Sequence, residues 1–176
     1  MTLQFTELTA IDETPEGFLE RVGHVFARFD ERTQDSGNIS FGVEIDGVRY
    51  FVKTAGLLDN RDCSIAHGQR TALLWNAKQL WEECPDPAFP RLEHTISASP
   101  WGPVLFYEWL EGELLGESRE RRNDPDTAFQ RFRRLPSEEI ERALETIYRA
   151  HDRFARMGWV AVDFYDGSLL YDFKLR

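Results

Sequence analysis

The chain has 176 residues, of which 41% are hydrophobic and 13% aromatic, so it can fold as one large domain or two small lobes. Its 21 basic and 31 acidic residues give a net charge of -10, which disfavours binding to nucleic acid. No stretch approaches the roughly 18 apolar residues of a membrane span, and no apolar leader follows Met1. We therefore expect a cytoplasmic protein with no membrane or nucleic-acid partner, in which Cys63 and Cys84 are free thiols rather than a disulfide or a metal site.

Turn signals and residue periodicity predict an α+β arrangement over residues 1–110. Thr14 and Pro15 mark the start of a short helix that ends at Gly23. Gly37 is the expected left-handed residue of the first turn between strands, and the Asp-Gly pair at 46–47 predicts a tight second turn. The predicted strands lie at 24–29, 39–45, 48–53, 92–97 and 104–110, with a helix from about 64 or 66 to 83 after the third strand. This order favours a five-stranded antiparallel sheet with one helix against it.

The predicted helix that follows the third strand carries an apolar face, which we expect to lie against the sheet. The residues of this face are Leu73, Leu74, Ala77, Leu80 and Trp81.

The remaining chain is predicted to form a linker at 111–136 and the beginning of a helical region at 137–176. The linker contains a short helix and six arginines, at 119, 121, 122, 131, 133 and 134. Because acidic residues are interleaved, we interpret it as solvated, with binding of an acidic or phosphorylated partner as the alternative. Ser137 is predicted to cap a long helix that ends at Gly158. The inward stripe of that helix is predicted to be Ile140, Leu144, Ile147, His151 and Phe154.

Three separate segments carry candidate chemistry. In the first, Lys53 ends a buried strand, where a fixed ammonium suits phosphate oxygens. In the second, 105–115, an apolar strand breaks at Gly112 and places backbone groups beside an apolar slot that suits a purine. In the third, Asp163 lies between an apolar stretch and a turn. Taken singly, the three are also compatible with a solvated Lys, an edge strand with a polar turn, and a turn-forming Asp.

In this order the three segments resemble the protein-kinase-like fold, which includes the aminoglycoside phosphotransferases. They are similar to a bacterial group labelled serine/threonine protein kinases, with signatures such as Val-Ala-Val-Asp-Phe-Tyr-Asp-Gly and Tyr-Glu-Trp-x-x-Gly-Glu-Leu-Leu. The resemblance implies an N-terminal lobe at 1–110, a hinge and linker at 111–136, and a partial C-terminal lobe at 137–176. It also implies transfer of the γ-phosphoryl of ATP, with Mg²⁺, to a Ser/Thr or other hydroxyl of a protein or small molecule.

The resemblance assigns roles to individual residues. The implied catalytic residues are Lys53, which would hold the α- and β-phosphates, and Asp163, which would accept the proton of the acceptor hydroxyl. Ser168 takes the place of an Asn that binds Mg²⁺, and a hydroxyl is a poor substitute for that amide oxygen. The implied nucleotide-binding residues are Gly37, Lys53, Tyr107, Glu108, Leu110 and Glu113.

The sequence also departs from the family pattern. It has no Gly-x-Gly-x-x-Gly motif, and Thr71 lies near the place of the helix Glu that pairs with the strand Lys. Ala161 and Val162 replace the His and Arg that precede the catalytic Asp, and the metal-binding Asp segment of the family would follow Arg176. We therefore expect this chain alone to be inactive. The alternative function is a non-catalytic, pseudokinase-like or truncated module that binds nucleotide or protein.

Overall fold

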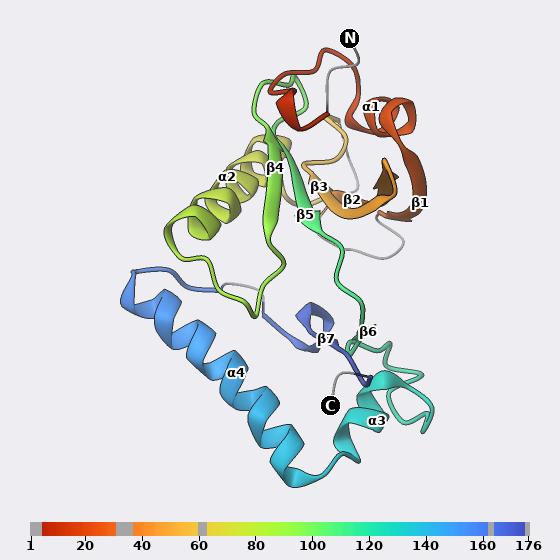
Figure 1. Cartoon of the computed structure of the whole chain (residues 1–176), viewed down its shortest axis with the longest axis vertical. Coiled ribbons are helices and arrows are strands. Elements are labelled where there is room, and N and C mark those ends of the chain that lie inside the picture. The colour runs from red at the N-terminus through yellow and green to blue at the C-terminus, as the bar shows by residue number, and fades with distance from the viewer. Residues whose placement is uncertain (1–4, 31–36, 60–62, 162–163, 175–176) are drawn as a thin grey trace. The chain divides into compact units, whose positions relative to one another are not determined.

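The computed structural model describes residues 5–30, 37–59, 63–161 and 164–174 and has an α+β fold (Figure 1). The chain separates into two compact units, Met1–Trp109 and Leu110–Arg176. The elements of the first unit are η1 (Phe5–Glu7), α1 (Pro15–Val22), β1 (His24–Phe29), β2 (Ile39–Ile45), β3 (Val48–Thr54), α2 (His67–Glu83), β4 (Leu92–Ile96) and β5 (Val104–Glu108). The second unit contains β6 (Glu113–Leu114), α3 (Ala128–Arg133), α4 (Ser137–Arg156), η2 (Asp166–Ser168) and β7 (Leu170–Tyr171).

The first unit is built on a five-stranded sheet of order β1-β2-β3-β5-β4, whose neighbouring strands are all antiparallel in the described residues. This confirms the predicted antiparallel sheet, with α2 as the connection between β3 and β4. The register aligns Lys53 with Ser40 on β2 and Leu105 on β5. Side chains alternate between the faces of a sheet, so these three lie on one face and Val52 lies on the other.

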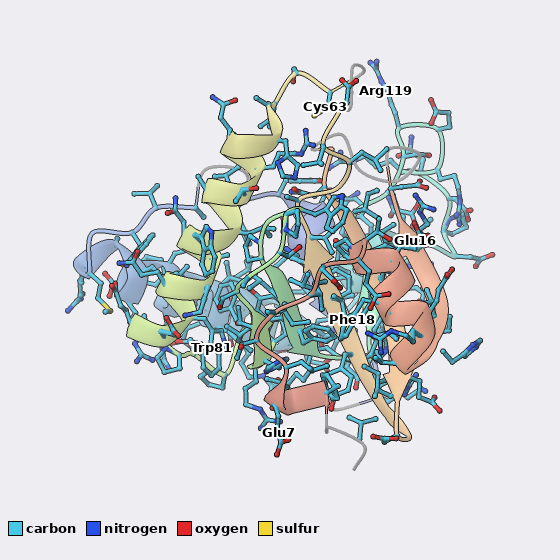
Figure 2. All side chains as sticks on the ribbon, turned by 90° about the horizontal axis from the view of Figure 1, so that it is seen from above. Glu7, Glu16, Phe18, Cys63, Trp81 and Arg119 are labelled. Carbon is cyan, nitrogen blue, oxygen red and sulfur yellow. The ribbon has the colours of Figure 1, made fainter. Side chains whose placement is uncertain are left out.

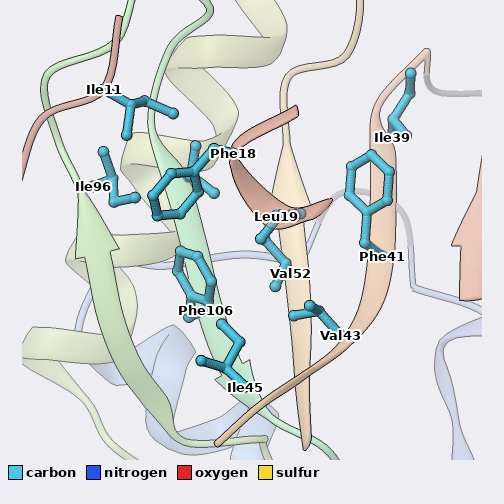
Figure 3. Packing of buried hydrophobic residues seen from close by; sticks show 11 residues of the cluster. Ile11, Phe18, Leu19, Ile39, Phe41, Val43, Ile45, Val52, Ile96 and Phe106 are labelled. Atoms are coloured by element: carbon cyan, nitrogen blue, oxygen red, sulfur yellow. The ribbon is translucent and has the colours of Figure 1, made fainter. Parts of the chain in front are cut away.

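Helix α1 packs on the face that carries Val52. It begins as predicted, because Thr14 Oγ1 accepts a hydrogen bond from the Gly17 N–H at 3.2 Å. Phe18 and Leu19 are fully buried, and Figure 3 shows them among the apolar side chains of the strands. The core of this face consists of Ile11, Phe18, Leu19, Ile39, Phe41, Val43, Ile45, Val52, Ile96, Val104 and Phe106.

Helix α2 covers the opposite face, and Figure 2 shows Phe18 and Trp81 on opposite sides of the sheet. Leu74, Ala77 and Trp81 contribute to the core of this face, together with Leu105 and Tyr107. The other members of this core are Phe51, Ala55 and Leu92.

Leu73 is 50% exposed, so its predicted place on the packed face of α2 is wrong. The packed residues repeat at intervals of three or four, and Arg70 occupies the inward position one turn before Leu74.

The second unit joins segments that are distant in sequence. Strands β6 and β7 pair antiparallel, with Glu113 opposite Tyr171. The predicted short helix of the linker is α3, whose cap Thr127 accepts a hydrogen bond from the Gln130 N–H at 3.3 Å. The Phe132 and Tyr171 rings meet edge to face, with their centroids 5.0 Å apart.

Two details of α4 differ from the sequence prediction. Pro136 precedes the first helical residue and no side chain caps the helix, so Ser137 is the first residue of α4 and not its cap. Leu144 is 55% exposed, so its predicted place on an inward stripe is wrong, whereas Phe154 is buried and Ile140 and Ile147 are half-buried. Gly158 has a φ of 84°, which confirms the left-handed residue predicted after the helix.

Candidate functional site

Lys53 lies one residue before the end of β3, on the face of the sheet that α2 covers. Its side chain is exposed, yet desolvation by the surrounding protein atoms lowers the pKa of its ammonium. Solvent contact at the exposed side chain limits that desolvation. An aromatic side chain of the same strand lies close to it: the Lys53 Nζ is 5.9 Å from the centroid of the Phe51 ring.

An aromatic group, which consists of Phe26, Phe29, Phe51 and Trp109, extends from Lys53 across the strands. The Phe51 ring lies 5.9 Å from Phe29 and 6.4 Å from Trp109 between centroids. Trp109 in turn meets Phe26 edge to face at 4.9 Å. The sheet therefore presents a cation beside several flat apolar surfaces, which suits a ligand that carries both an anionic and an aromatic part.

Close glycine contacts join the turn before β2 to the loop after β3. Gly37 is buried with a φ of 73°, as the sequence predicts, and Gly56 has a φ of 72°. A Cβ at Gly56 would overlap the Gly37 carbonyl oxygen. Thr54 adds a second link, because its Oγ1 donates to the Ile39 carbonyl at 2.8 Å. Gly37 therefore contacts the loop that follows β3. Only residues 54–56 separate Lys53 from that contact, so two predicted nucleotide-binding residues are linked through the loop.

Tyr107 and Glu108 end β5 in different environments. Tyr107 is buried on the α2 side of the sheet, and desolvation raises the pKa of its hydroxyl to about 12. The Glu108 N–H donates to the Arg91 carbonyl, and a Glu108 carboxylate oxygen accepts from the Arg91 N–H, both at 2.9 Å. The N–H and side chain of Glu108 are therefore engaged by Arg91 at the edge strand.

The other predicted site residues belong to the second unit. Leu110 is partly exposed, and the Glu113 carboxylate accepts two hydrogen bonds from Arg131 Nη1, at 2.7 and 2.9 Å. Arg131 also stacks on the Phe173 ring at 4.1 Å. Asp163 lies outside the described residues.

Ser168 is exposed at the end of η2, five residues after Asp163. The neighbouring Asp166 pairs with Arg122 at 3.2 Å. A Cβ at Gly116 would lie 2.5 Å from the Gly167 Cα, so the two backbones are in contact there. The Arg-rich segment therefore contacts the η2 loop through Arg122, whose side chain remains 55% exposed.

The described donors do not fit a magnesium site. Ser168 offers only a hydroxyl, and Arg122 neutralises Asp166. No group of three or more His, Cys, Asp or Glu side chains able to hold a metal occurs in the part of the chain that the structure describes.

Sequence reasoning missed Arg70 and the aromatic group. Arg70 occupies the inward position of α2 next to Thr71, which was predicted to stand near the place of the family's Glu. Its spacing of four residues from Leu74 is the signal that could have placed it on the packed face. The aromatic group depends on the register of β1 to β3 and left no local signal.

No protein-family model matches the sequence, and the curated proteins include no similar sequence. Among the described helices, none has an apolar run long enough to cross a membrane.

Proposed function

We propose that this chain binds ATP through the Lys53 face of its sheet and serves phosphoryl transfer of the protein-kinase-like type to a hydroxyl acceptor. The observation that carries the proposal is the placement of Lys53. It is a cation on the third strand of an antiparallel sheet, on the face covered by the helix that connects β3 to β4. That placement agrees with the role that the sequence resemblance implies for this residue.

The residues around Lys53 supply the contacts that ATP needs. The Lys53 ammonium would pair with phosphate oxygens, as a point charge fixed on a strand. The aromatic group would offer flat apolar surfaces to the purine. The left-handed turn at Gly37 would offer backbone N–H groups to a phosphate. Asp163 would orient the acceptor hydroxyl and receive its proton.

A non-catalytic nucleotide-binding module is the second candidate, and α2 favours it. The first acidic residue of α2 is Glu82, near its C-terminal end, so this helix carries no carboxylate before that position. The inward residues of α2 are Arg70, Leu74, Ala77 and Trp81. The described residues also lack a fitting set of magnesium ligands, so we derive no catalytic step through the metal.

Replacing Lys53 tests the binding site directly. We expect saturating ATP with Mg²⁺ to raise the melting temperature of the wild-type chain, since a ligand that binds only the folded state stabilises it. Lys53→Met should abolish that rise because the ammonium no longer pairs with the phosphates. The measurement is thermal unfolding at increasing ATP concentration.

Lys78→Met is the matched control. Lys78 is the other lysine of the first unit and pairs with Glu82 one turn further along α2. The melting temperature of Lys78→Met should rise with ATP as that of the wild type does. Equal responses of the wild type and Lys53→Met would remove Lys53 from the site.

A further inference from the structure

Arg70 is a buried cation whose hydrogen bonds, among the described residues, all go to backbone carbonyls. Its residue is 1% exposed, and its guanidinium pairs with no carboxylate among the described residues. Removing a guanidinium from water is costly, and carbonyl oxygens compensate less than a carboxylate would. A Met of similar length would avoid that cost, so the charge at this position calls for an explanation beyond packing.

The guanidinium gathers three carbonyl oxygens of the loop between β3 and α2. The Arg70 Nε donates to Ala55 at 2.7 Å, Nη2 donates to Leu57 at 2.6 Å, and Nη1 donates to Ile65 at 2.6 Å. Ala55 and Leu57 flank Gly56, whose φ is 72°. Both carbonyls beside this left-handed residue thus accept hydrogen bonds from Arg70. The Arg70 side chain therefore fixes the turn at residues 55–57, which begins two residues after Lys53.

The same side chain reaches the turn before β2. A Cβ at Gly37 would lie 3.2 Å from Arg70 Nη1 and would overlap the Cys63 Sγ. Cys63 lies in the loop before α2 (Figure 2), and its Sγ accepts from the Ile65 N–H at 3.4 Å. Ile65 is also the residue whose carbonyl accepts from Arg70. The turn of Gly37 therefore rests on a surface that Arg70 organises.

We propose that Arg70 is a positioning residue of the Lys53 site, which holds the turn after Lys53 and the turn of Gly37 in the arrangement that meets nucleotide phosphates. The inference rests on the proposed nucleotide binding. A planar guanidinium with several fixed donors can hold three carbonyls at once, whereas an ammonium on a single atom cannot match that geometry.

The test compares Arg70→Met and Arg70→Lys with Ile96→Ala. Ile96 is fully buried in the core on the α1 side of the sheet, so its truncation lowers stability without touching the loop. ATP affinity is measured by calorimetry at a temperature at which every variant is folded. Hydrogen exchange is measured at the amides of residues 37–38 and 55–57.

We expect Arg70→Met to weaken ATP binding about tenfold or more, since small misplacements of binding groups are costly. Hydrogen exchange at the selected amides should also rise in Arg70→Met. Arg70→Lys should show the same two changes with smaller magnitude. Ile96→Ala should retain the ATP affinity of the wild type. If Arg70→Met does not fold, the same comparison is made with Arg70→Lys.

Three results would overturn the inference. One is equal ATP affinity in an Arg70 variant and Ile96→Ala at matched melting temperature. Another is exchange at the selected amides that matches the wild type. The third is a wild-type chain that does not bind ATP, which removes the proposed function itself; the exchange measurement then still reports whether Arg70 holds the loop.

Discussion

Two basic side chains on the α2 side of the sheet illustrate how neighbours decide the role of a residue. Lys53 is exposed beside aromatic rings, and it can therefore meet a ligand. Arg70 is buried against carbonyl oxygens, and it can act only by holding backbone in place. Their charges are equal, and only the surrounding atoms distinguish a binding residue from a positioning residue.

Tyr107 leads to a pH-dependence prediction. Burial raises the pKa of its hydroxyl to about 12, above the roughly 10 expected for an unfolded chain. The folded state therefore holds the Tyr107 proton more tightly than the unfolded state does. The stability that the protonated hydroxyl contributes is complete below about pH 10 and is lost as the pH rises toward 12. We expect the free energy of unfolding to fall more steeply in the wild type than in Tyr107→Phe over that range.

Urea unfolding at several pH values between about 9 and 12 measures the effect. The difference in the free energy of unfolding between wild type and Tyr107→Phe cancels the titration of the other groups. Parallel curves for wild type and Tyr107→Phe would mean that the hydroxyl ionises freely in the folded protein.

At the scale of elements, the pairing of strands explains why β2 has a glycine at its centre. Gly42 is buried opposite Ala27 on β1 and Phe51 on β3. A Cβ on Gly42 would lie 2.5 Å from the Phe26 ring and 3.0 Å from the Trp109 ring. The aromatic group therefore crosses the sheet at the point where β2 has no side chain.

Gly42→Ala should destabilise the first unit by about 1–3 kcal/mol, because the added methyl forces the two rings apart. Denaturant unfolding followed by tryptophan fluorescence measures this loss. Combining Gly42→Ala with Phe26→Ala should cost less than the sum of the two single substitutions, since removal of the Phe26 ring makes room for the methyl. Strict additivity would show that the rings do not pack over Gly42.

The burial of residues on helix α4 cannot be predicted from the sequence of that helix alone. Its period predicts an apolar stripe, yet Leu144 and the neighbouring Tyr148 are exposed, at 55% and 70%. Amphipathicity identifies the apolar face of a helix, but the covering of that face depends on what packs against it.

For the whole molecule, the predicted site residues divide between two units. Gly37, Lys53, Tyr107 and Glu108 belong to Met1–Trp109, and the others belong to Leu110–Arg176. Nucleotide binding and transfer to an acceptor can therefore be tested separately, through residues of different units.

Asp163→Asn separates binding from transfer. We expect Asp163→Asn to leave the ATP-dependent rise in melting temperature unchanged. In a longer parent chain that includes a metal-binding Asp segment, it should lower transfer of the γ-phosphoryl by about a hundredfold or more, since an amide cannot accept the hydroxyl proton. Transfer is followed with γ-labelled ATP and an acceptor protein, and Asp166→Asn is the control. Equal transfer by wild type and Asp163→Asn would place the base elsewhere, and binding without transfer by the wild type would favour the non-catalytic module.

By itself, the sequence determined the five strands of the first unit, their antiparallel arrangement and the helices α1, α2 and α4. The Thr14 cap, the tight turn at 46–47 and the left-handed glycines act within a few residues, so their signals are local and complete. The position of Lys53 at the end of β3 follows from the same local rules.

Only the tertiary structure decided which partners those residues meet. Arg70 turns inward because carbonyls of the loop between β3 and α2 converge on it. Glu113 is engaged by Arg131, 18 residues later in the chain. The pairing of β6 with β7 joins segments more than 50 residues apart. Such contacts depend on the register and packing of distant segments, whose geometry arises only when the chain has folded.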